Sequence, residues 1–175
     1  MKKPLAGFTI VELVVVIVVI GILAGITILS YSRSQLNARD TAIKNAAAQT
    51  ADALQLWSTR TNLAPNATNT TVNGITGSTS ATGWVQSGKY TRTIEDVLVD
   101  HGYLSKGFSS NLQTSAVSNN SNILMFYACS NGRYAVYAAL NDTSKQSEYQ
   151  TKANDAGCPT TQFSTSYKMN YVLIF

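Results

Sequence analysis

The most constraining feature of this chain is a long apolar segment near its N-terminus that contains a single charged residue. The segment runs from Phe8 to Leu29, which is close to the about 20 helical residues needed to cross the apolar layer of a bilayer. Its charged residue is Glu12. A carboxylate in such a layer is unfavourable and needs a compensating role. The segment therefore predicts a membrane helix with a functional acid near its start.

The seven residues before this segment form a short basic leader. In an ordinary secretory signal the small-residue cleavage site follows the apolar stretch, whereas here the small residue Gly7 precedes it. Cleavage after Gly7 would remove Lys2 and Lys3, which favour the cytoplasmic side, and would keep the apolar helix on the mature chain. The new amine of Phe8 would lie about one helical turn from Glu12 and could also pair with Glu12 of a neighbouring molecule.

This arrangement resembles the N-terminus of a type IV prepilin. The residues that carry the resemblance are the leader ending in Gly7, the sequence Phe8-Thr9-Ile10-Val11-Glu12-Leu13, and the apolar run behind it. The resemblance implies that a prepilin peptidase cuts after Gly7 and that the amine of Phe8 is methylated. It also implies that Glu12 directs subunits into a homopolymeric filament, with pilus assembly machinery in the cytoplasmic membrane as a partner. A plain signal anchor is the alternative.

The apolar pattern and the resemblance together divide the chain into four parts. These are a leader (1–7), a transmembrane and assembly helix (8–29), an amphipathic continuation of that helix (30–61) and a globular head (62–175). No Pro or Gly occurs between Ile26 and Leu63, so one helix is predicted to continue to about Thr61. Its second half has a one-sided pattern with a spacing of three, four or seven positions, at Leu36, Ile43, Ala47, Ala51, Leu54 and either Trp57 or Ser58.

Gly21 and Gly25 form a G-x-x-x-G motif in the apolar half of the predicted helix. Small residues at this spacing allow close helix packing, so the motif favours contact between subunits. Two glycines that a membrane helix merely tolerates remain the alternative interpretation.

The head is predicted to be α+β, with the long helix packed on a small antiparallel sheet. Apolar and aromatic runs at 122–129 and 133–140 are joined through Ser130-Asn131-Gly132, which is typical of a hairpin. A third run, 167–175, is suited to a C-terminal strand, and a short strand is possible near Trp84. The apolar face of the sheet is expected to cover the Leu54 and Trp57 side of the helix.

A second, short helix is predicted at 94–101. Thr93 and Asp96 have the spacing of an N-terminal cap, and Gly102 follows the last turn. The stretch 142–159 is polar and is interpreted as irregular, with a possible helical turn around Glu148. Asn66, Asn69, Asn119 and Asn141 begin glycosylation sequons, which arise readily in a chain this rich in Asn and Thr.

Cys129 and Cys158 are the two cysteines of the chain. An exported domain meets oxidising conditions, so this pair is predicted to form a structural disulfide. The single histidine, His101, has no Cys or His at ligand spacing, and no metal site or cofactor is predicted. Asn141, Asp142, Asn154 and Asp155 could offer oxygens to Ca²⁺, but a solvated loop is favoured because EF-hand spacing is absent.

The composition fits an exported subunit better than an enzyme or a nucleic-acid-binding protein. Charged residues make up 13% of the chain, and the formal net charge of +4 falls to +2 when Lys2 and Lys3 are removed. Arg33 and Arg39 follow the apolar segment, and the other basic residues are scattered rather than gathered into a patch. The sequence indicates no catalytic triad and no phosphate-binding loop, so no enzyme activity is predicted.

The resulting prediction is a structural subunit of a type IV pilus, a single-pass precursor in the bacterial cytoplasmic membrane that ends in an extracellular filament. Such a filament serves adhesion, twitching motility or DNA uptake. A pseudopilin or minor pilin of a secretion or competence system is the second interpretation, favoured by Leu29 where pilus-forming members often have a proline. A filament-tip adhesin module with Asn/Thr-rich loops is the third.

Overall fold

The computed structural model describes residues 9–62, 65, 82–85, 93–117 and 123–175. The chain divides into two compact units, Met1–Leu36 and Asn37–Phe175. Gly7 and Phe8 lie outside the described residues, as do most of the polar stretch after the long helix and the sequons at Asn66, Asn69 and Asn119.

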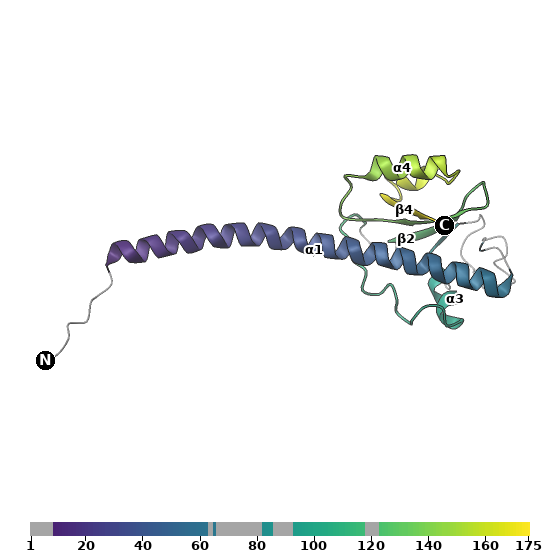
Figure 1. Cartoon of the computed structure of the whole chain (residues 1–175), viewed down its shortest axis with the longest axis horizontal. Helices are drawn as coiled ribbons and strands as arrows, with labels where there is room; N and C mark the ends of the chain where they lie inside the picture. The colour runs from purple at the N-terminus through teal and green to yellow at the C-terminus, as the bar shows by residue number, and fades with distance from the viewer. Residues whose placement is uncertain (1–8, 63–64, 66–81, 86–92, 118–122) are drawn as a thin grey trace. The chain divides into compact units, whose positions relative to one another are not determined.

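The long helix α1 spans Ile10–Thr61 and has 52 residues (Figure 1). Up to Leu36 the described side chains of this helix are all exposed. From Asn37 onward a one-sided stripe is buried, and it contains Ile43, Ala47, Ala51, Leu54 and Trp57 as predicted. Leu36 was expected in this stripe and is 40% exposed. The prediction that Leu36 is buried was wrong, because the first buried position of the helix is Asp40, one turn later.

Four short strands form one antiparallel sheet in the order β1-β2-β3-β4. The strands are β1 (Thr82–Trp84), β2 (Leu124–Ala128), β3 (Tyr134–Ala138) and β4 (Tyr171–Ile174). Phe126 lies opposite Gly83 on one side and Val136 on the other, and Val136 lies opposite Leu173. The β2–β3 turn places Gly132 at φ 78°, a left-handed conformation that glycine adopts without steric cost. The predicted hairpin and C-terminal strand are therefore confirmed.

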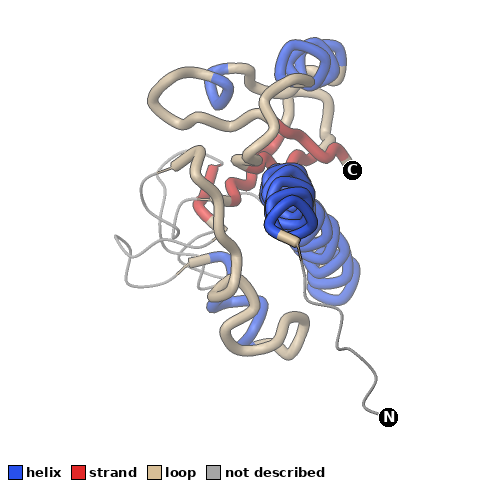
Figure 2. The backbone as a smooth tube through the Cα atoms, turned by 90° about the vertical axis from the view of Figure 1, so that its left-hand side faces the viewer, coloured by secondary structure: helices blue, strands red, loops and turns tan. Residues whose placement is uncertain are grey.

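The sheet is buried on both faces because alternate residues of each strand point to opposite sides. One face, with Leu124, Phe126, Val136 and Ala138, packs with the buried stripe of α1 in a single apolar cluster. The other face belongs to a second cluster around Met125, Tyr137, Val172, Cys158, Phe163 and Met169. Viewed along α1, the sheet lies between that helix and helix α4 (Gln146–Asp155) (Figure 2). This long helix on a small antiparallel sheet is the predicted α+β arrangement and is consistent with the pilin fold.

The short helix α3 spans Ile94–Asp100 and begins with the predicted cap. The side chain of Asp96 accepts a hydrogen bond from the backbone N–H of Thr93 at 2.7 Å, and the Thr93 hydroxyl accepts one from the N–H of Asp96 at 3.4 Å. Gly102, at φ 73°, follows the helix, and Tyr103 and Leu104 then pack on the core. The prediction of a capped helix ended by glycine is confirmed.

The stretch after β3 differs from the sequence-based expectation. A ten-residue helix, α4, spans Gln146–Asp155, where a single helical turn within an irregular segment was expected. A 3₁₀ turn, η3, follows at Thr161–Phe163. α4 is mostly polar and buries only Ala153 within its span, so its sequence carries almost no apolar periodicity that would signal a helix.

Candidate assembly site

The N-terminus of α1 is organised around Glu12. Its carboxylate accepts hydrogen bonds from the backbone N–H of Thr9 at 2.9 Å and from the Thr9 hydroxyl at 2.8 Å. The Thr9 hydroxyl in turn accepts a hydrogen bond from the N–H of Glu12 at 3.3 Å. This reciprocal pair is a capping box, which satisfies N–H groups that have no partner within the helix. Glu12 therefore caps the N-terminus of α1 in addition to carrying a negative charge.

Sequence reasoning assigned Glu12 to assembly but missed Thr9. The signal was present, because a Thr followed three residues later by a Glu in front of an apolar run is the sequence pattern of a capping box.

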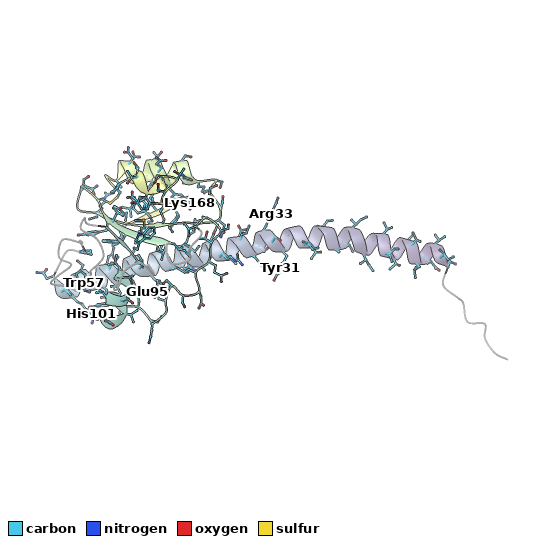
Figure 3. All side chains as sticks on the ribbon, turned by 180° about the vertical axis from the view of Figure 1, so that it is seen from behind. Tyr31, Arg33, Trp57, Glu95, His101 and Lys168 are labelled. Atoms are coloured by element: carbon cyan, nitrogen blue, oxygen red, sulfur yellow. A yellow bond between two sulfur atoms is a disulfide. The ribbon has the colours of Figure 1, made fainter. Side chains whose placement is uncertain are left out.

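The apolar half of α1 exposes its side chains to an unusual degree. Val11 is 70% exposed, Ile17 58% and Ile28 68%. By length and composition this part of the helix can cross a membrane, and none of its most apolar window is buried. A continuous apolar surface of this kind requires a bilayer or other apolar helices around it. Tyr31 and Arg33, just beyond it, project to different sides of α1 (Figure 3).

Gly21 and Gly25 lie in the middle of this apolar surface. A Cβ atom added at either glycine would meet no other group of the chain within 4 Å. Packing within the chain therefore does not require glycine at these two positions.

Cys129 and Cys158 are joined in a disulfide, with a Cα–Cα distance of 4.3 Å. This is the pair that the sequence analysis expects. Cys129 directly follows β2, and Cys158 follows α4, so the bridge joins the β2–β3 turn to the end of that helix. The N–H of Ser130 also donates to the carbonyl of Gly157 at 2.9 Å, which reinforces the same connection.

Asp40 is a buried acid that the sequence analysis did not single out. It is 5% exposed, and its carboxylate accepts hydrogen bonds from the connection between β3 and α4. Its position was readable, since it lies four residues after Leu36 and three before Ile43, on the apolar stripe. Asp142, in the same connection, accepts a hydrogen bond from the N–H of Ser144, which lowers the pKa of its carboxyl below the usual value.

The four residues considered as Ca²⁺ ligands are not brought together by a common loop. Asn141 and Asp142 donate their backbone N–H groups to Asp40, and Asn154 and Asp155 lie on α4. Within the part of the chain that the structure describes, no three His, Cys, Asp or Glu side chains are arranged to hold a metal ion. The side-chain amide of Asn141 also donates to the Asp40 carboxylate, at 2.7 Å. The Asn of this glycosylation sequon therefore has a hydrogen-bond partner within the head.

Glu95 lies on α3, and His101 directly follows that helix (Figure 3). Glu95 is 8% exposed, and its carboxylate accepts hydrogen bonds from the N–H and the hydroxyl of Ser109. This holds the segment after α3 against the helix. The Nδ1 atom of His101 lies 2.8 Å from the carbonyl oxygen of Val97, and its ring stacks on Tyr103. Both side chains therefore have partners within the head.

Comparison with known proteins places a family motif on the same N-terminal region. Residues 3–28 match the family described as Prokaryotic N-terminal methylation motif, which is the class III signal of type IV pilins. No curated protein matches the sequence, and no solved structure matches it either. The motif implies processing by a prepilin peptidase and handling by pilus assembly machinery, and with the apolar helix it fits a membrane-anchored precursor. The chain thus carries the class III signal on a long helix packed against a small antiparallel sheet, which is consistent with a type IV pilin-like protein.

Proposed function

We propose that this chain is the structural subunit of a type IV pilus. After cleavage between Gly7 and Phe8 and methylation of the Phe8 amine, the subunit stays in the cytoplasmic membrane through residues 8–29. It then leaves the bilayer and polymerises into an extracellular filament. The head, residues 62–175 with the amphipathic part of α1 (30–61), forms the outer surface, and the chain performs no catalysis.

The observation that carries this proposal is the exposed apolar half of α1, which lies within the methylation motif at residues 3–28. Once the helix leaves the bilayer, only other apolar helices can cover such a surface, so membrane storage and polymerisation use the same side chains. Gly21 and Gly25 support the proposal, because neither is needed for packing within the chain and both allow close approach of a neighbouring helix. Glu12 would pair with the Phe8 amine of the neighbour.

A pseudopilin or minor pilin is the second candidate. The feature that favours it is Leu29, which stands where pilus-forming members often have a proline, within an α1 that runs unbroken from Ile10 to Thr61. Such a subunit would use the same leader, anchor and assembly residues but would form a short periplasmic or wall-spanning fibre.

Electron microscopy of intact cells labelled with an antibody against the head tests the proposal. A pilus subunit gives long surface fibres labelled along their whole length. Labelling confined to fibre tips indicates a minor pilin or tip adhesin, and label that appears only after the envelope is opened indicates a pseudopilin. Either of these two results overturns the proposed role.

A further inference from the structure

The first docked turn of α1 is held to the head by hydrogen bonds that one buried carboxylate, that of Asp40, accepts. One oxygen of Asp40 accepts hydrogen bonds from the backbone N–H and from the side-chain amide of Asn141, each at 2.7 Å. The other oxygen accepts the backbone N–H of Asp142 at 2.9 Å. Hydrogen bonds to a charged acceptor are stronger than neutral ones, and burial strengthens them further.

Asn141 extends this connection to another part of the head. Its side-chain oxygen accepts hydrogen bonds from the N–H of Ser115 at 2.9 Å and from the Ser115 hydroxyl at 2.8 Å. On the other side, the Asn170 amide donates to the carbonyl of Leu140 at 2.8 Å, next to Asn141. The groups that donate to Asp40 are thus held in place by two neighbouring segments of the head.

The apolar contacts of α1 with the head are unevenly distributed along the helix. Between Asp40 and Ala53 the buried apolar side chains are Ile43 and four alanines, which bury little apolar surface each (Ala46, Ala47, Ala51 and Ala53). Leu54 and Trp57, at 1% and 2% exposure, supply the large apolar groups at the C-terminal end of the helix. The docked helix therefore has two large apolar anchors at its C-terminal end. Its N-terminal part is held by the hydrogen bonds to Asp40, by Ile43 and by the Lys44 ammonium 5.8 Å from the centre of the Tyr171 ring.

We propose that Asp40 and Asn141 form a latch whose opening releases residues 37–50 of α1 from the head while Leu54 and Trp57 keep the rest of the helix in place. The released segment contributes Ile43, Ala46 and Ala47 to the core cluster, whereas the strands, the disulfide, Leu54 and Trp57 all lie outside it. We therefore expect the head to stay folded when the latch opens. The latch is a conformational device of the head and exists whether or not the chain forms a filament.

Its use rests on the proposed function. A subunit drawn out of the membrane, or loaded within a filament, transmits force along α1 from its N-terminal side. That force reaches Asp40 before it reaches Leu54 or Trp57, so the latch determines whether the alanine-rich part of the helix is peeled from the head.

The latch can be tested by thiol labelling of the intact mature chain in detergent micelles. Ala46→Cys places a buried thiol in the segment that the latch controls, and Ala53→Cys places one beside the C-terminal anchor; the native cysteines are protected by their disulfide. Each reporter is combined with Asp40→Asn, which keeps the shape of the side chain but replaces one acceptor oxygen with a donor amide. Asp52→Asn, an exposed acid on the same helix, is the matched control.

Asp40→Asn is expected to raise the maleimide labelling rate at position 46 at least tenfold and at position 53 less than twofold. Asp52→Asn should change neither rate. Asn141→Ala removes one of the three donors and should give a smaller increase at position 46, which provides a second test if Asp40→Asn protein cannot be recovered. Equal increases in the labelling rate at positions 46 and 53 would mean that Asp40 stabilises the whole head. Unchanged labelling rates would mean that Asp40 does not hold residues 37–50 to the head. Either result overturns the latch. Neither of these two labelling results depends on whether cells carry surface fibres.

Discussion

The Thr9 hydroxyl and the Glu12 carboxylate lie 2.8 Å apart and close a capping box at the start of α1. Glu12 thus has two separable properties, a negative charge and the ability to accept hydrogen bonds from Thr9. A charge is required to pair with the Phe8 amine of a neighbouring subunit, whereas capping requires only an acceptor.

Substitution at Glu12 distinguishes these two properties. Glu12→Gln keeps an acceptor for Thr9 and removes the charge, and Glu12→Val removes both. If charge pairing drives assembly, both variants should be cleaved normally but should lose at least nine-tenths of the filament, because the amine of each neighbour stays unpaired. The measurement is the ratio of sheared surface filament to membrane-bound mature subunit. Normal filament from Glu12→Gln, with loss only in Glu12→Val, would assign the role to capping instead.

The mature chain recovered from cells is expected to begin at Phe8 with a methylated amine. Cleavage at this position spares the apolar helix, which the subunit needs as its anchor. Mass spectrometry of the N-terminal peptide measures both the start and the added methyl group. A mature chain that starts after Leu29 would contradict the leader assignment and, with it, the proposed role of α1.

Trp57→Ala should destabilise the head strongly, because the side chain is 2% exposed and fills the contact between α1 and the sheet. A loss of about 3–5 kcal/mol in the free energy of unfolding is expected for a buried Trp. Leu56→Ala is the matched control, since Leu56 is its neighbour in sequence and is 45% exposed. That substitution should stay within about 0.5 kcal/mol of the wild type in urea unfolding. Similar losses in both variants would contradict the assigned face of the helix.

Loss of the disulfide should lower stability without changing the fold. Cys129 and Cys158 are separated by 29 positions, and closing a loop of this size contributes about 3–4 kcal/mol in the chain-entropy model. A truncated chain that begins at Gln35 should be a soluble, folded monomer, since Asn37–Phe175 is a compact unit. Urea unfolding of this chain with both cysteines replaced by Ser measures the loss. Two titratable thiols in the unreduced wild type would show that the bridge is absent.

Stability at high pH should depend on Tyr137. Its side chain is fully buried and its hydroxyl donates to the carbonyl of Pro159 at 2.6 Å; burial, with a smaller effect of Tyr127, raises its pKa in the folded state. The unfolded chain therefore releases this proton first, at a pKa of about 10. The stabilisation is fully present below that pH and is lost as the pH rises further.

The expected size of this effect is a fall of up to about 1.4 kcal/mol in the free energy of unfolding for each pH unit above 10. Tyr137→Phe should be less stable at neutral pH, through loss of the hydrogen bond, but should show a shallower fall. Urea midpoints of the truncated chain at pH 9 and pH 11 give the comparison. Parallel pH dependence in the two proteins would mean that Tyr137 ionises in the folded state.

Much of the fold follows from local sequence patterns. The apolar run up to Ile28, the Thr93 and Asp96 cap and the Asn131-Gly132 hairpin each encode an element through spacing or through the chemistry of a few neighbouring residues. The N-terminal methylation motif at residues 3–28 was equally readable, because it is a short linear pattern.

The tertiary structure decided what local patterns do not contain. The burial of Asp40 and the exposure of Leu36 depend on where the head meets the helix, although both residues fit the same apolar spacing. The partner of Asp40 lies 101 positions away at Asn141, and nothing near either residue identifies the other. The helix at Gln146–Asp155 likewise owes its formation to packing on the sheet, since its own sequence is polar almost throughout. Sequence periodicity determines which element forms and which of its faces is apolar, whereas burial and long-range hydrogen bonding depend on which faces meet.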